Sequence, residues 1–146
     1  MGLFDGFKTK TQPVFTAQKA VMTIVIAAIK ADGNVSDEEV GRLRSMCARS
    51  PLFSANSKEE DDAVIDFALN VSDQLGTDAV KKAAEALTPE LKETAFAFAT
   101  EIVLADSMVG EKEEAFISQL AGVLGVSDDL GRAVIQVTMI RARGEQ

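Results

Sequence analysis

The feature that most constrains this chain is an acidic turn that occurs twice, each time between a strongly apolar segment and an amphipathic one. The copies span residues 31–39 and 105–113, and both fit the pattern A-D-x-x-V-x-[DE]-x-E. A shift of 74 residues (105 − 31) superimposes them together with their apolar flanks, so that Ile29 falls on Val103 and Leu43 on Ile117. The chain therefore contains a duplicated unit of helix, turn and helix.

Apolar residues recur at helical spacing along the chain, and turn or capping residues separate the helical segments. Spacings of three and four from Val14 to Ala28 predict a central first helix, and an apolar surface around most of the segment 89–103 predicts a second central one. Capping boxes are expected at Ser36 and Ser57. Seven helices are expected, beginning near Val14, Ser36, Ser57, Thr77, Pro89, Gly110 and Ser127, the last with an apolar stripe of Leu130, Val134, Val137 and Ile140.

These segments predict an all-α fold: a single domain over residues 13–146, with about seven helices in two pseudo-symmetric halves at about 13–75 and 88–141. Contact between the two central helices is expected to bring the two turns to comparable positions. Residues 1–12 form a separate leader. Its Leu3, Phe4, Phe7, Lys8 and Lys10 are typical of a weak interfacial anchor, and a frayed terminus is the alternative.

Composition excludes several classes of function. The chain has no histidine and one cysteine, so typical zinc, copper and iron centres and disulfide frameworks are not expected, and Cys47 lies on an apolar helical stripe that indicates core. A net charge of −8 disfavours nucleic acid as a partner. No nucleophile elbow, phosphate-binding glycine loop or dithiol is found, which predicts a protein that is not an enzyme.

The location of the protein is also constrained. The longest strongly apolar stretch, residues 20–29, is about half of what a membrane span needs, so no direct span is expected. The sequence shows no secretory signal, and a lone cysteine fits a reducing compartment. A cytoplasmic protein is therefore predicted.

The acidic turns supply the candidate site. Asp32 lies at the end of one helix and Glu39 in the first turn of the next, so both carboxylates can converge over the loop. Asp106 and Glu113 occupy the same positions in the second copy. Four carboxylates with turn carbonyls and water form an oxygen-rich site that suits a hard cation such as Ca²⁺ or Mg²⁺.

A purely structural role for these acids is the alternative. Glu39 fits a capping box with Ser36, and Asp32 fits as a turn former. Glu113 is explained less well, because Gly110 offers it no capping hydroxyl. An EF-hand fails, since Asp37 stands where its turn glycine belongs and Leu43 where its bidentate glutamate belongs.

The segment Ile29-Lys30-Ala31-Asp32-Gly33-Asn34-Val35-Ser36-Asp37-Glu38-Glu39, with Ala105-Asp106, Glu113 and Leu124-Gly125-Val126, resembles the TerB tellurite-resistance family. The leader residues Gly2-Leu3-Phe4-Asp5 are also similar to the start of that family. The resemblance implies an all-helical fold in two related halves and a cytoplasmic stress protein linked to tellurite resistance. It also implies a metal site at Asp32, Glu39, Asp106 and Glu113, and an integral membrane partner, TerC.

Two hypotheses follow. In the first, the protein binds a divalent cation through its duplicated turns and takes part in the stress response without catalysis. In the second, it is a metal-independent helical adaptor that docks a membrane or cytoplasmic partner of the resistance complex. A membrane partner would place the protein at the inner face of the membrane. The second turn departs from the family pattern at Ser107-Met108, so the half with Asp32 and Glu39 is expected to bind more strongly. Direct binding of anionic tellurite by these carboxylates is disfavoured by repulsion.

Overall fold

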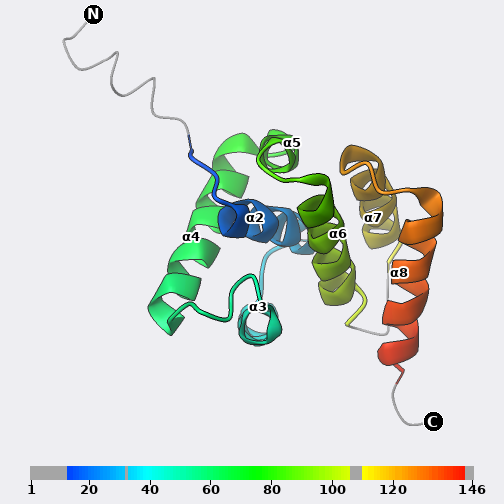
Figure 1. Cartoon of the computed structure of the whole chain (residues 1–146), viewed down its shortest axis with the longest axis horizontal. Coiled ribbons are helices and arrows are strands. Elements are labelled where there is room, and N and C mark those ends of the chain that lie inside the picture. The colour runs from blue at the N-terminus through cyan, green and yellow to red at the C-terminus, as the bar shows by residue number, and fades with distance from the viewer. Residues whose placement is uncertain (1–12, 32, 106–109, 144–146) are drawn as a thin grey trace, which may run out of the picture.

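The computed structural model describes residues 13–31, 33–105 and 110–143. Within these ranges it contains seven α-helices and no strand, which confirms the all-α prediction (Figure 1). The helices are α2 (Ala17–Lys30), α3 (Asp37–Arg49), α4 (Lys58–Leu75), α5 (Asp78–Glu85), α6 (Pro89–Val103), α7 (Glu111–Val123) and α8 (Asp128–Arg141). None of these helices is long and apolar enough to cross a membrane.

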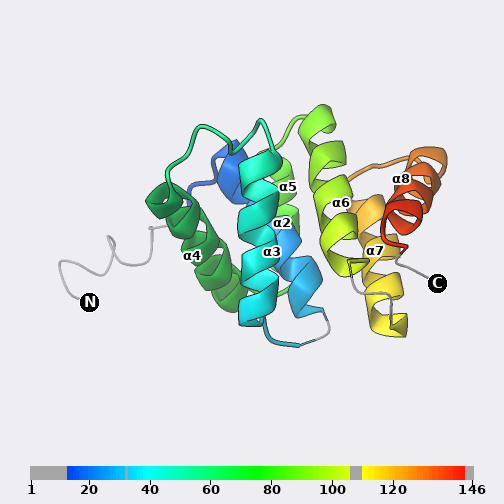
Figure 2. The same ribbon diagram turned by 90° about the horizontal axis from the view of Figure 1, so that it is seen from below.

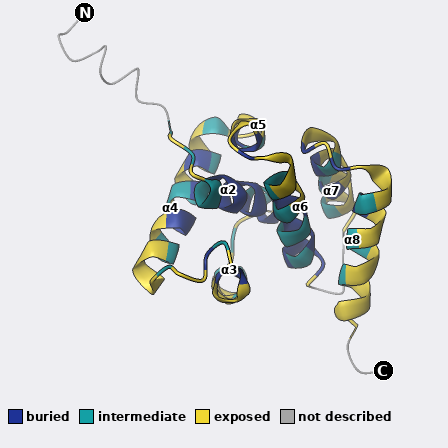
Figure 3. Ribbon diagram, in the orientation of Figure 1, coloured by how far each residue is buried: buried dark blue, intermediate teal, exposed yellow. Residues whose placement is uncertain are grey.

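Helix α2 is the centre of the fold. Its run of small and branched apolar residues is buried on all sides, and α4, α5 and α6 pack around it (Figures 1 and 3). A helix that is apolar around its whole circumference is stable in water only when other elements enclose it. The predicted role of this segment as a central helix is confirmed.

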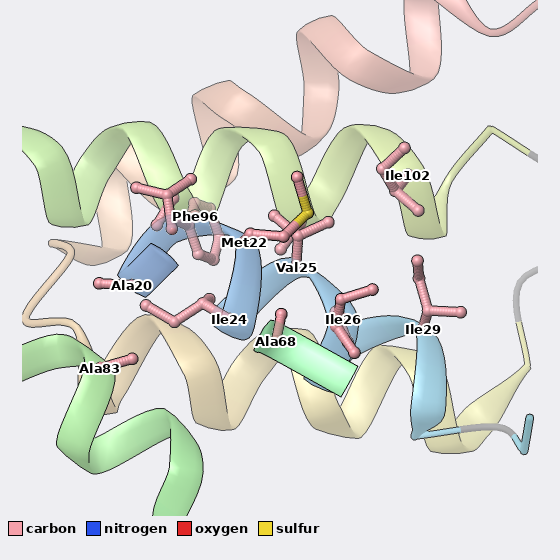
Figure 4. Close-up of a cluster of buried hydrophobic side chains, with 14 of the residues drawn as sticks. Ala20, Met22, Ile24, Val25, Ile26, Ile29, Ala68, Ala83, Phe96 and Ile102 are labelled. Carbon is pink, nitrogen blue, oxygen red and sulfur yellow. The ribbon is translucent and has the colours of Figure 1, made fainter. Parts of the chain in front are cut away.

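Helix α6 is the second central helix and joins the two groups of helices. One side of it packs along α2, and α7 and α8 cover another side. Figure 4 shows Phe96 beside Ala20 and Met22, and Ile102 near Ile29, so α2 and α6 run in the same direction. The predicted contact between the two apolar helices is present.

Local capping residues set most of the helix boundaries. The hydroxyls of Ser36, Ser57, Thr88 and Ser127 each accept a hydrogen bond from the backbone N–H three residues ahead. Gly125 follows the end of α7 with a φ of +67°, a conformation that glycine adopts without strain. Thr77 was predicted to cap α5, but its side chain makes no such bond, because its backbone is already helical.

Two predictions about the core are wrong. Val14 was placed on the buried stripe of the first helix, but that helix begins at Ala17 and Val14 is 76% exposed. The stripe on α8 is only partly buried: Leu130 and Val134 pack against the core, whereas Val137 and Ile140 are about half exposed. Val14 precedes the first helix, and α8 lies at the outside of the fold, where α6 is the main helix packed against it (Figure 3).

Candidate functional site

The first acidic turn joins α2 to α3 and ends in a complete capping box. Oε1 of Glu39 accepts hydrogen bonds from the backbone N–H and the hydroxyl of Ser36, both at 3.0 Å. The hydroxyl oxygen of Ser36 in turn accepts from the backbone N–H of Glu39 at 3.2 Å. The glutamate is thus held over the N-terminus of α3, where the positive end of the helix dipole favours a carboxylate.

The second turn holds Glu113 in the corresponding way. Oε1 of Glu113 accepts a hydrogen bond from the backbone N–H of Gly110 at 3.1 Å. Gly110 has no hydroxyl, so this is half of a capping box. The sequence-based expectation that Glu113 lacks a good capping role is therefore wrong, because capping by the glutamate needs only the backbone N–H of the residue three positions before it.

The structure describes only two of the four predicted metal ligands. Asp32 and Asp106 lie outside the described residues, so the structure places only Glu39 and Glu113. Within the described ranges, no three Asp, Glu, Cys or His side chains are grouped as metal ligands. The convergence of the four carboxylates stays a prediction.

The described residue at the start of each turn shares a groove with the helix that follows the other turn. Ala105, at the start of the second turn, lines a groove together with Glu38 and Arg42 of α3, which we call the α3/α6 groove. Ala31, at the start of the first turn, lines a groove together with Lys112 and Ala115 of α7, which we call the α2/α7 groove. The two copies of the motif are therefore interleaved.

The two grooves use corresponding positions of the two copies. Seven pairs of lining residues are separated by 74 positions: 27 and 101, 31 and 105, 38 and 112, 41 and 115, 42 and 116, 45 and 119, 49 and 123. Figure 2 shows the N-terminal ends of α3 and α7, together with the C-terminal ends of α2 and α6, at the same lower edge of the molecule. Helix ends that carry the two acidic motifs are thus gathered at one edge.

A model of the family "Tellurite resistance protein TerB" matches residues 18–134 of this chain. The chain belongs to the TerB family. The matched range contains both acidic turns, five helices in full, from α3 to α7, and nearly all of α2. Comparisons with curated proteins and with solved structures gave no match.

Charged side chains around the first turn of this TerB-family domain are partly neutralised. The ammonium group of Lys30, next to Ala31, forms an ion pair with Asp73 of α4. The guanidinium group of Arg42 pairs with Glu38 at 3.0 Å, one helical turn apart. Both cations near the turn thus have a carboxylate partner away from Glu39, which lowers the repulsion that a bound metal ion would meet there.

Cys47 takes no part in this edge of the TerB domain. It is fully buried on α3, as its apolar stripe predicted. Burial, with a smaller contribution from the carboxylate of Asp61, raises the pKa of its thiol to about 12. A thiol with so high a pKa is neither a metal ligand nor a nucleophile at neutral pH.

Proposed function

We propose that this member of a tellurite-resistance family is a non-enzymatic cytoplasmic protein that binds a divalent cation, Ca²⁺ or Mg²⁺, through Asp32, Glu39, Asp106 and Glu113. The proposal rests on the interleaving of the two turns. Ala31 lines one groove with the start of α7 and Ala105 lines the other with the start of α3, so the described residue before each turn lies beside the helix start of the other copy.

The chemistry of the described glutamates is compatible with this role. Each carboxylate uses Oε1 to cap its own helix, and a carboxylate has a second oxygen with further acceptor capacity. A glutamate that is fixed by capping also pays less conformational entropy when it binds an ion. Capping and metal ligation are therefore roles that one side chain can combine.

The acidity of the edge favours a cation over an anion. The first turn of α3 carries Asp37, Glu38 and Glu39, and the first turn of α7 carries Glu111, Glu113 and Glu114. These carboxylates outweigh the partial positive charge at two helix N-termini, which is about half an elementary charge each. A hard divalent ion with oxygen ligands suits such a site, and tellurite, an anion, does not.

The experiment is calcium titration of the full chain by isothermal calorimetry, repeated with magnesium. The proposal predicts saturable binding that is lost in the double variant Asp32→Asn/Asp106→Asn. The matched control is Asp37→Asn/Glu111→Gln, which removes the same charge from two exposed positions that are also related by the 74-residue shift. Absence of binding heat in the wild-type chain, or equal loss in both variants, would overturn the proposal.

A second candidate function is a metal-independent adaptor. It is favoured by the apolar residues Val137, Met139 and Ile140, which are 48–56% exposed on α8. Exposed apolar residues grouped on one helix are typical of protein contact surfaces. In this alternative the partner is a TerC-like membrane protein or a cytoplasmic protein of the resistance complex, and cations leave the thermal stability of the chain unchanged.

A further inference from the structure

The α2/α7 groove differs in charge from the rest of the molecule. Three lysines line it: Lys30 of α2, whose ammonium is paired with Asp73, and Lys81 of α5 and Lys112 of α7. No carboxylate is among its described lining residues, although the chain as a whole carries a net charge of −8. Lys81 and Lys112 are exposed, so their charges are accessible to a partner.

The rest of the groove is mostly apolar. Small side chains of α2 and larger apolar groups of α5 and α7 line it. The residues concerned are Ala27 and Ala31, then Val80, Phe116, Leu120 and Val123. Val123 is 43% exposed although its helix packs on the core, so part of this apolar lining faces water.

The length and volume of the α2/α7 groove indicate which kind of secondary structure could bind in it. The groove extends along α7 from Lys112 to Val123, which is eleven helical steps of 1.5 Å, or about 17 Å. Its volume is about 1040 Å³. A helix with its side chains is about 10–12 Å across, whereas a single extended chain needs about half of that.

We propose that the α2/α7 groove binds an acidic amphipathic α-helix of about three turns from another protein. The apolar face of that helix packs on the groove-lining apolar residues, Phe116 and Val123 among them, and its carboxylates pair with Lys81 and Lys112. This inference does not depend on a metal at the acidic turns.

A second copy of this chain does not supply such a helix. Three exposed apolar residues are grouped on α8, but its Asp128 and Asp129 are offset by Arg132 and Arg141, and Arg143 follows, so α8 is not an acidic helix. The acidic helix is α4, but its apolar residues are buried against α2. Charge and burial therefore both point to a different protein as the partner.

The test uses a fluorescein-labelled synthetic peptide of about 14 residues, with leucines on one helical face and glutamates on the other. Fluorescence anisotropy measures its binding to the full chain. A peptide of the same composition with scattered leucines is expected to bind at least about tenfold more weakly, because it presents no continuous apolar face. Equal affinity for the two peptides, or no binding of the first, would overturn the proposal.

Variants locate the site. Lys81→Glu/Lys112→Glu is expected to weaken peptide binding at least about tenfold, since two attractive charge pairs become repulsive. The control Lys58→Glu/Lys82→Glu makes the same charge change at exposed lysines outside the groove, and we expect it to alter the affinity less than about twofold. Circular dichroism and thermal unfolding verify that both variants fold.

Three other outcomes would contradict the proposal. The first is equal weakening by the two double variants, which would indicate a general charge effect. The second is capture of the chain by phosphatidylglycerol vesicles without any peptide binding, which would assign the lysines to a lipid surface. The third is a dimer in sedimentation equilibrium that Lys81→Glu/Lys112→Glu dissociates, which would assign the groove to a second copy.

Discussion

The carboxylate of Glu113 accepts a hydrogen bond from the backbone N–H of Gly110, and Glu39 makes the same bond to Ser36 in the other copy of the motif. The two glutamates thus have one structural role in common, which the duplication preserved even though only one copy has a capping hydroxyl. A glutamine keeps an acceptor at this position but loses the negative charge. Capping and cation binding are therefore experimentally separable.

The first prediction concerns capping alone. In the presence of a chelator, Glu113→Ala is expected to lower the free energy of unfolding by about 0.5–1 kcal/mol, because the N–H of Gly110 loses its acceptor. Glu113→Gln is expected to change it by less than about 0.3 kcal/mol. Urea unfolding followed by circular dichroism measures both values. Equal destabilisation by the two substitutions would show that the hydrogen bond to Gly110 is not what holds the glutamate in place.

The second prediction tests the corrected limits of the core. Val25→Ala, in the fully buried centre of α2, is expected to cost about 2–3 kcal/mol, because two methyl groups are lost and a cavity remains. Val14→Ala is the matched control, since the same atoms are removed from a residue that is 76% exposed, and we expect a cost below about 0.5 kcal/mol. Similar costs for both would mean that Val14 is packed after all.

The sequence contains most of the information about where helices begin and end. Ser36, Ser57 and Ser127 act through a bond to a backbone group three residues away, and such local chemistry is readable from the chain. The errors concern residues whose surroundings depend on other helices. Whether Val137 is buried depends on which helices pack against α8, which no local pattern encodes.

The candidate site was likewise predictable only where its features are local in the sequence. The repeated spacing of the acids was evident from the chain, and the pairing of Glu39 with Ser36 followed from it. The position of Ala105 beside α3 and of Ala31 beside α7 was not evident, since it results from the packing of α6 beside α3 and of α2 beside α7. The lysine-lined groove was missed for the same reason, because Lys30, Lys81 and Lys112 come from three separate helices.

The third prediction follows from the buried thiol. Burial raises the pKa of Cys47 from its ordinary value of 9.0 to about 12. Between pH 9 and 12 the unfolded chain loses this proton and the folded chain keeps it, so the stability that Cys47 contributes is complete below pH 9 and falls as the pH rises. The expected slope from this group is about −1.4 kcal/mol per pH unit.

Urea unfolding of the wild type and of Cys47→Ala from pH 8 to pH 10.5 measures this slope by difference. The substitution lowers stability at every pH because it leaves a cavity, so only the change of the difference with pH is informative. The difference in free energy of unfolding between the wild type and Cys47→Ala is expected to become smaller above pH 9. A constant gap would contradict the raised pKa of the thiol.

The fourth prediction concerns the inequality of the two turns. The second turn carries Ser107 and Met108 where the first carries Gly33 and Asn34, so it lacks the two turn-forming residues of the first. Asp32→Asn is therefore expected to weaken calcium binding at least about tenfold, and more than Asp106→Asn does. Calorimetric titration of the two single variants gives the comparison. A greater loss in Asp106→Asn would assign the stronger half to the second turn.

The central claim, that the two turns bind one class of cation together, is tested most directly by amide NMR during a calcium titration of the ¹⁵N-labelled chain. Gly33 and Gly110 report on the first and second turns, and Ser57, which caps an acidic helix start outside the site, is the internal control. We predict that the amide signals of Gly33 and Gly110 shift along saturable curves while that of Ser57 stays in place. Stationary signals at both glycines, or an equal shift at Ser57, would contradict a cation site at the duplicated turns.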